Sequence, residues 1–154
     1  MTQEQKERLN GFFVMVFNQI LAWEDQSLRS VGYKDISVRE MHIIEAISLL
    51  EGQGTNTMAN IAKILSVSPG SLTTAVNALV NKGYVERWRS ESDRRVVLVR
   101  PTEKGMEVNA RHKGFHDELV DFVTEAISEK DLDGTLKSLE KLAEYFMKKA
   151  AVKR

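Results

Sequence analysis

Apolar residues recur three or four positions apart along most of the chain, and this spacing predicts a mainly helical protein. It predicts one long amphipathic helix over about residues 3–29, a break at Gly32–Asp35, and a second helix that begins after the cap residue Ser37. Two long helices follow near the C-terminal end, over about residues 102–127 and 129–149. The apolar stripe of the first consists of Val108, Phe115, Leu119, Phe122 and Ala126. We expect the second to bury Leu132, Leu136, Leu139, Ala143 and Phe146.

Start and stop signals divide the middle of the chain into a short helix, a turn, another helix and a β-hairpin, over about residues 57–65, 66–68, 69–82 and 84–100. The strongest signal is Ser68 followed by Pro69, because proline in the first helical position loses no hydrogen bond. The hairpin is predicted from two β-branched or aromatic runs that flank a polar tip.

This order of elements predicts a mainly α fold with a small β-wing, that is, a winged helix-turn-helix. We expect one domain over residues 1–154, in which 37–104 forms the winged helix-turn-helix and 1–35 and 105–154 form dimerisation helices. Such long flanking helices have more apolar surface than a lone winged module can cover. A second copy of the chain would cover it, so we expect a homodimer.

Charge is distributed unevenly, although the formal net charge is zero. Residues 55–104 contain eight Lys and Arg against four Asp and Glu, whereas the segments on either side are slightly acidic. A local basic surface of this kind suits DNA. The chain has no cysteine, and its apolar run Phe12–Phe17 is too short to cross a membrane, so we expect a cytoplasmic protein without a membrane partner.

A helix pair followed by a basic hairpin can place one element in a DNA groove and the other along the phosphates. The candidate DNA contacts are the cap and outward side chains of the 69–82 helix and the polar side chains of the hairpin: Ser68, Ser71, Thr73, Thr74, Asn77, Arg87, Arg89, Asp93, Arg94 and Arg95. An isolated arginine pair would be interpreted as solvated charge, but here the arginines cluster on one hairpin.

Four segments resemble the MarR (multiple-antibiotic-resistance regulator) family of winged helix-turn-helix regulators: Val67–Gly70, Lys82–Arg87, Ser92–Arg95 and Thr102–Gly105. The resemblance implies that the 69–82 helix enters the major groove of double-stranded operator DNA and that the hairpin tip reaches the minor groove. It also implies that one tip arginine inserts while Asp93 holds the other, and we favour Arg95 for insertion. Asn60, where an acidic residue is frequent in the family, and the bulky Trp88 depart from the pattern.

A narrower similarity links the segments Asp35–His42 and Arg111–His116 to the repressors of fatty-acid biosynthesis within this family. It implies a repressor that binds a pseudo-palindromic operator and responds to an acyl group on acyl carrier protein or to another small molecule. The aromatic residues of the first helix and Met15 would then line an acyl pocket, although such a stripe is more often core or dimer interface: Phe12, Phe13, Met15, Phe17 and Trp23.

The three histidines and one carboxylate form a candidate metal set. His112 and His116 are four residues apart, a spacing that lets two imidazoles meet one metal ion, and Glu24 falls on an apolar helix side where a carboxylate needs a partner. With His42, they are similar residue by residue to the zinc ligands of the zinc-uptake repressors of the family. No cofactor is required, but zinc suits this set, and its affinity should fall below about pH 6 as the imidazoles become protonated.

Two other interpretations of the same residues remain open. Glu24 could simply pair with a histidine in the core, or the protein could be a zinc-responsive regulator of metal homeostasis.

A metal-dependent enzyme is a remote alternative, because the sequence shows no Gly-rich phosphate loop and no nucleophile with an evident base. Ser138–Lys141 matches a Ser-x-x-Lys pattern but stands alone, and we interpret it as solvated surface. We therefore expect no enzyme activity.

Overall fold

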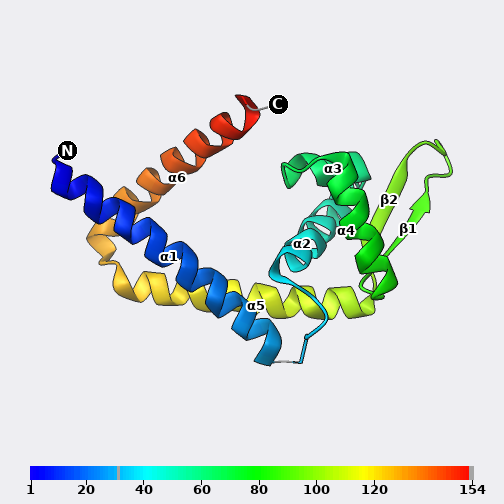
Figure 1. The fold of residues 1–154 in the computed structure, drawn as a ribbon, viewed down its shortest axis with the longest axis horizontal. Coiled ribbons are helices and arrows are strands. Elements are labelled where there is room, and N and C mark those ends of the chain that lie inside the picture. Colours follow the sequence, from blue (N-terminus) through cyan, green and yellow to red (C-terminus); the bar gives the residue numbers. More distant parts are fainter. Residues whose placement is uncertain (31, 153–154) are drawn as a thin grey trace. The chain divides into compact units, whose positions relative to one another are not determined.

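The computed structural model describes residues 1–30 and 32–152, and within them it contains six helices and one antiparallel pair of strands (Figure 1). The elements are α1 (Gln3–Ser30), α2 (Val38–Gly52), α3 (Met58–Ile64), α4 (Pro69–Asn81), β1 (Val85–Arg89), β2 (Val97–Pro101), α5 (Glu103–Ala126) and α6 (Glu129–Val152). The predicted fold class is confirmed, and most boundaries lie within two residues of those predicted.

The chain forms two compact units, Met1–Phe115 and a second unit that begins at His116. The single domain and the two dimerisation segments stay predictions. Residues 31, 153 and 154, which those segments include, lie outside the described residues. No described helix is both long and apolar enough to cross a membrane.

The core of the first unit lies where α2, α4 and the base of the hairpin meet. Its fully buried side chains come from every element between α2 and the start of α5: Met41, Ile44, Ile47, Ile61, Leu72, Val76, Leu79, Tyr84, Val85, Val99 and Val108. Burying each large aliphatic side chain stabilises the fold by about 1.5–3 kcal/mol. Most of this core comes from the buried sides of α2 and α4.

Polar caps set the helix starts. Ser37 and Glu40 form a reciprocal capping box at α2, while Thr57 and Ser68 accept hydrogen bonds from the backbone at the starts of α3 and α4. The turn between α3 and α4 includes Ser66 at φ 54°, the left-handed region that non-glycine residues seldom adopt. These local signals explain why the helix-turn-helix could be predicted closely.

Asn56 attaches the hairpin to the helix-turn-helix. It is buried; its side-chain amide donates to the Val99 carbonyl at 2.7 Å, and its own carbonyl accepts from the Val99 N–H at 3.0 Å. Thr57 also forms a β-bridge with Leu98. The segment before α3 therefore adds a short third edge to the two-stranded sheet, and the hairpin is held at its base.

Thr102 and Gly105 attach α5 to the same base. The Thr102 hydroxyl donates to the Gly83 carbonyl at 2.7 Å and accepts from the Gly105 N–H at 3.2 Å. Gly105 lies so close to the backbone of Tyr84 that a Cβ at this position would overlap the Tyr84 carbonyl oxygen. The same Cβ would lie 3.0 Å from Cβ of Pro101. The motif Thr102–Gly105 thus fixes the start of α5 against the hairpin.

In the single chain the apolar sides of the C-terminal helices are exposed beyond Phe115, and their predicted burial would require a second copy of the chain. Val108 and Phe115 are buried, but Phe122, Leu136, Leu139 and Phe146 are 66%, 48%, 51% and 53% exposed. Leu119 and Leu132 are only partly buried, and Ala126 and Ala143 are exposed. The helical period identifies which side of a helix is apolar but not what covers that side. Within the described residues, these exposed side chains are not covered by another element.

Gly105→Ala should destabilise the protein by about 3 kcal/mol, because the added methyl group must displace the backbone at Tyr84. The matched control is Gly114→Ala in the same helix, where a Cβ would meet no atom within 4 Å. It should be neutral or stabilise the helix by about 0.5–1 kcal/mol. Urea unfolding followed by circular dichroism measures both changes. Equal stability of the two variants would contradict the close approach at Gly105.

Candidate nucleic-acid interface and metal centre

The outer side of α4 presents short hydroxyl side chains to solvent. Ser68, Ser71, Thr73 and Thr74 are all exposed. The hydroxyls of Thr73 and Thr74 donate to carbonyls one turn earlier, at 2.8 and 3.2 Å, which leaves their oxygens able to accept. The Ser68 hydroxyl caps the helix by accepting from the Ser71 N–H at 3.2 Å. This is the side on which the sequence placed DNA contacts, and the contacts themselves stay predictions.

A side-chain hydrogen bond links the hairpin to α4. The Arg87 guanidinium on β1 donates to the Asn77 side-chain carbonyl at 2.5 Å, and both residues are exposed. The amide NH₂ of Asn77 takes no part in this bond and can donate to other acceptors. Two residues predicted to contact DNA separately are therefore joined, and their bond sets the hairpin relative to α4.

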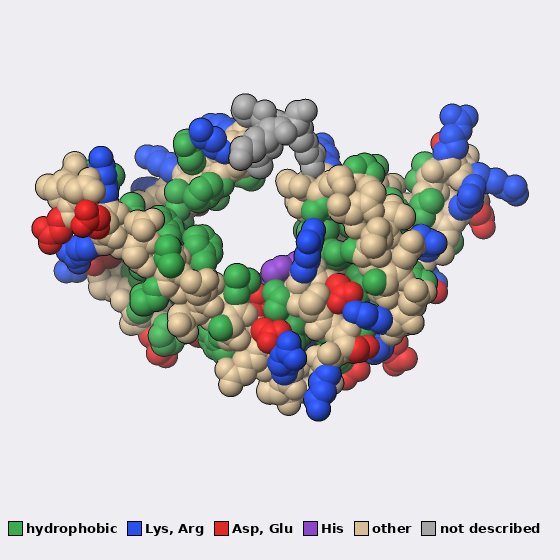
Figure 2. All heavy atoms as spheres, viewed as in Figure 1, with side chains coloured by type: hydrophobic (Ala, Val, Ile, Leu, Met, Phe, Trp, Pro, Cys, Tyr) green, Lys and Arg blue, Asp and Glu red, His purple; other side chains and the backbone are tan. Residues whose placement is uncertain are grey.

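The tip of the hairpin carries a cluster of cations (Figure 2). Arg89 donates to the Arg94 carbonyl at 3.3 Å, and the Asp93 carboxylate accepts from the Arg95 N–H at 2.9 Å. Asp93 also lies 3.9 Å from Nε of Arg95, whose side chain is 95% exposed. The structure thus pairs Asp93 with Arg95, the arginine favoured for insertion, rather than with Arg94. A charge that extends so far into solvent can reach a phosphate or a groove.

Trp88 on β1 and Arg100 on β2 contact each other across the hairpin. The Arg100 guanidinium lies 5.1 Å from the Trp88 ring centre and pairs with Glu86. This arrangement accounts for the bulky Trp88, which departs from the family pattern: it supports a cation on the neighbouring strand. The pairing with Glu86 partly neutralises Arg100.

The structure brings together three of the four predicted metal ligands. Oε1 of Glu24 on α1 lies 2.8 Å from Nε2 of His42 on α2 and 2.5 Å from Nε2 of His112 on α5. Glu24 and His112 are buried, at 3% and 2% exposure. The two imidazoles satisfy a carboxylate that would otherwise be costly to bury. Their candidate ligand atoms all lie within 4.8 Å of one another, and nitrogen with carboxylate oxygen is a donor set that zinc accepts.

The fourth predicted ligand, His116, lies one helical turn beyond His112 on α5, in the second unit. Its part in a metal site stays a prediction. Sequence reasoning missed Glu45, whose Oε1 lies 3.7 Å from Nδ1 of His112, on the side of the ring opposite Glu24. A carboxylate beside the second nitrogen is common where histidine binds a metal. The signal was available, because Glu45 stands three residues after His42 on α2.

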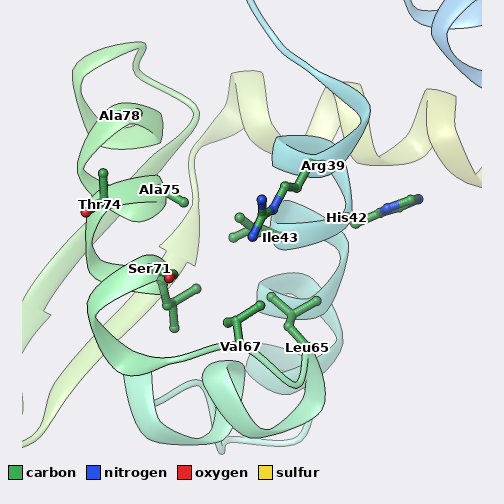
Figure 3. Close-up of a pocket in the computed structure, with 10 residues that line it drawn as sticks. Arg39, His42, Ile43, Leu65, Val67, Ser71, Thr74, Ala75 and Ala78 are labelled. Atoms are coloured by element: carbon green, nitrogen blue, oxygen red, sulfur yellow. The ribbon is translucent and has the colours of Figure 1, made fainter. Parts of the chain in front are cut away.

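A cavity of about 600 Å³ separates the first half of α2 from α4 (Figure 3). Its walls are mostly apolar, from Ile43, Leu65, Val67, Leu72, Ala75 and Ala78, with Arg39, His42, Ser71 and Thr74 as polar members. Figure 3 shows Arg39 directed from α2 toward α4 and His42 directed away from it. Arg39 was not among the predicted site residues, although an arginine two residues after a helix cap is readily visible in sequence.

Known proteins resemble this chain in sequence and fold. A family model described as MarR family matches residues 37–97. YpoP of Bacillus subtilis, an HTH-type transcriptional regulator, is 36% identical over 93 residues, which cover 60% of this chain and 61% of YpoP. The transcriptional regulator ZitR of Lactococcus lactis is 31% identical over 87 residues, covering 56% of this chain and 60% of ZitR. The match therefore spans about three fifths of the length of these two regulators. Among solved structures, Streptococcus pneumoniae FabT in complex with DNA is 36% identical, with a TM-score of 0.85 over 93% of this chain and 98% of FabT.

Proposed function

The chain belongs to the MarR family of DNA-binding transcriptional regulators, and from this premise we propose that it is a homodimeric repressor of a pseudo-palindromic operator. The observation that carries the proposal is the joined surface of α4 and the hairpin. Hydroxyl side chains are exposed on α4, the hairpin tip carries arginines, and the Arg87–Asn77 hydrogen bond connects the two elements. The relatives are regulators, and the protein is not an enzyme.

Each part of this surface has a task that its chemistry suits. In the proposed complex α4 enters the major groove, where Ser, Thr and Asn side chains contact base edges or phosphates. The tip arginines reach the adjacent minor groove, whose negative potential attracts guanidinium groups. A two-fold dimer would place two copies of α4 about one helical turn of DNA apart, which is why the operator is expected to be pseudo-palindromic.

Exposed apolar side chains on both units support the homodimer. On α1 they are Leu9, Phe12, Val14, Met15, Phe17 and Leu21, each about half exposed. On the second unit they include Val120, Phe122, Leu136, Leu139 and Phe146. Apolar surface on this scale marks an interaction site rather than a solvated surface, and a second copy of the same chain presents matching surfaces.

The regulated process in this proposal is fatty-acid biosynthesis, with an acyl group on acyl carrier protein, or another small molecule, as effector. The segments Asp35–His42 and Arg111–His116 favour it, and the likeness to FabT is consistent with it. Such an effector can act only through a difference in its affinity for two dimer geometries. The aromatic side chains of α1 divide between two environments, since Trp23 packs edge-on against Phe115 while Phe12 and Phe17 are exposed.

Zinc-responsive regulation is the second candidate function. The specific observation in its favour is the buried contact of Glu24 with both His42 and His112, which joins α1, α2 and α5. A zinc ion held by these residues would act as a structural or sensing cation there. Glu45 beside His112 and the likeness to ZitR add support. Zinc binding requires neutral imidazoles, so acid should release the metal.

Operator binding tests the repressor proposal. The probe is a duplex of the region upstream of the gene that encodes this chain, assayed by gel shift at two salt concentrations. Specific retardation should weaken steeply with salt. The double variant Arg94→Ala/Arg95→Ala should bind about tenfold or more weakly and have a shallower salt slope, by about 0.9 for each phosphate that the variant no longer neutralises.

The matched control for the wing variant is Lys137→Ala/Lys141→Ala on α6, which removes the same charge from exposed positions of the second unit. It should bind like the parent protein. Absence of retardation at micromolar protein would remove the DNA-binding function, and equally weakened binding by both double variants would mean that only net charge matters.

Phe17→Glu should convert the dimer to monomer. Phe17 is 58% exposed in the single chain and stacks on Phe13, so the protomer should fold, but a carboxylate in an apolar interface is costly. Sedimentation at micromolar concentration measures the change, and operator affinity should fall at least tenfold with it. Asn18→Glu, exposed on the next position of α1, is the control and should stay dimeric. A Phe17→Glu dimer would show that α1 does not form the interface.

Zinc content after purification without added metal tests the second function. The parent chain should hold one zinc, and His42→Ala, whose side chain is 39% exposed, should lose it without unfolding. Asp25→Asn changes the exposed carboxylate next to Glu24 and should keep the metal. Operator affinity should also change when a chelator removes zinc. A zinc-free parent protein, or stoichiometric zinc in both His42→Ala and His112→Ala, would contradict this site.

A further inference from the structure

We propose that Arg39, in the first turn of α2, is a DNA-binding residue that contacts a phosphate on the edge of the major groove opposite the hairpin. The inference rests on the DNA-binding function above and extends its surface to a third element. DNA contact would then come from the hairpin on one side of α4, from α4 itself, and from α2 on the other side.

The first observation concerns the charge of Arg39. Its side chain is exposed, and within residues 1–30 and 32–152 no hydrogen bond or ion pair engages its guanidinium. Four other cations of the first unit are paired, Arg29 with Asp25, Lys82 with Glu40, Lys104 with Asp35 and Arg100 with Glu86, whereas Arg39, like Lys63 and Arg94, is in no ion pair among the described residues. Arg39 therefore presents a whole positive charge without a neighbouring carboxylate to neutralise it.

The second observation concerns direction. Arg39 lines the cavity between α2 and α4 together with Ser71 and Thr74, and its side chain extends from α2 toward α4 (Figure 3). Ser71 and Thr74 are exposed on α4 and belong to its predicted DNA-contacting side. The guanidinium thus borders the same surface that would face the duplex.

The third observation is the position of α2 relative to the hairpin. Arg87 of the hairpin bonds to Asn77, which lies about 120° around α4 from Ser71 at 3.6 residues per turn. The hairpin and α2 therefore flank α4 on different sides. A helix in the major groove, which is about 12 Å wide, has a phosphate backbone along each edge. In the proposed complex the hairpin lies at one of these edges, and Arg39 contacts a phosphate at the other.

The first turn of α2 is also held firmly, which a specific phosphate contact needs. Glu40 closes the capping box with Ser37 and bonds to Lys82 at 2.7 Å, and His42 bonds to Glu24 at 2.8 Å. These bonds lie on either side of Arg39 along the helix. Guanidinium offers a planar pair of N–H donors that matches two phosphate oxygens, so an arginine at a fixed position gains more than a mobile one.

The test compares Arg39→Ala, Arg39→Lys and the parent full-length protein on a duplex of about 40 bp, long enough for two half-sites one helical turn apart, from the gene's own upstream region. A shuffled duplex of the same composition measures non-specific binding. Arg39→Ala should bind about tenfold more weakly per protomer, equally on both duplexes, and should have a salt slope shallower by about 0.9 per phosphate no longer neutralised. Arg39→Lys keeps the charge and should keep most of the slope.

Arg29→Ala is the control for net charge, since Arg29 pairs with Asp25 on an exposed part of α1. It should leave the salt slope unchanged, and thermal unfolding should show all variants folded. An Arg39→Ala protein with the parent affinity and slope overturns the inference while leaving the repressor proposal intact. Weaker binding of Arg39→Ala to the specific duplex alone, with no change in salt slope, would also overturn the inference. A third outcome would overturn it as well: Arg39→Ala has the salt slope of the parent but loses a saturable binding of octanoate that the parent shows, which would make the cavity an effector site. Failure of the parent protein to bind either duplex would instead remove the DNA-binding function.

Discussion

The proposed DNA-binding surface of α4 and the hairpin depends on how the hairpin is attached to the helix-turn-helix. An isolated two-stranded hairpin is marginal in water, and this one has little core of its own, because four of the five β1 residues are exposed. Its base is held by Asn56, which bonds twice to Val99, and by Thr102, which bonds to the Gly83 carbonyl at the end of α4. With the base fixed and Arg87 bonded to Asn77, the tip and α4 keep one spacing. A fixed spacing lets two weak sets of contacts act on DNA as one.

The same need for fixed geometry explains the polar groups in and around the core. Lys82, just after α4, bonds to Glu40 at the start of α2, and burial, which acts to raise the pKa of Glu40, is outweighed by hydrogen bonds from Lys82 and Ser37 that lower it. Lys104 lies 3.8 Å from the Tyr84 ring centre, and the Tyr84 hydroxyl donates to Asp35. Burial and the Asp35 carboxylate together raise the pKa of Tyr84. Polar pairs of this kind fix how α2, α4 and α5 pack around the small apolar core, because each pair forms only at one separation of these helices.

Sequence reasoning performed best where structure is local. Caps and proline located the starts of α2, α3 and α4 because Ser37, Thr57 and Ser68 act on backbone groups within three residues. It does not determine what covers Leu136 and Phe146, which are exposed in the single chain, since their burial depends on surfaces outside the helix that carries them. The proximity of Glu24, His42 and His112 followed from a family resemblance, whereas Glu45, Asn56 and Arg39 were missed. The role of Asn56 depends on Val99, which is distant along the chain, and spacing alone carries no such information. Glu45 and Arg39, in contrast, stand near His42 and the cap Ser37, so the sequence did contain a signal for them.

The position of α2 connects the two candidate sites. His42 faces Glu24 on one side of the helix, and Arg39, three residues earlier, extends toward α4 (Figure 3). A helix is stiff over one turn, so a ligand that changes the distances among Glu24, His42 and His112 must either distort this turn or rotate it as a body. Rotation would move Arg39 relative to Ser71 and Thr74 and alter the fit of that surface to DNA. The coupling is reciprocal: if metal changes operator affinity by some factor, operator DNA must change metal affinity by the same factor. A buried carboxylate between two imidazoles is suited to such coupling, because a shift of Glu24 weakens its hydrogen bonds to His42 and His112 together.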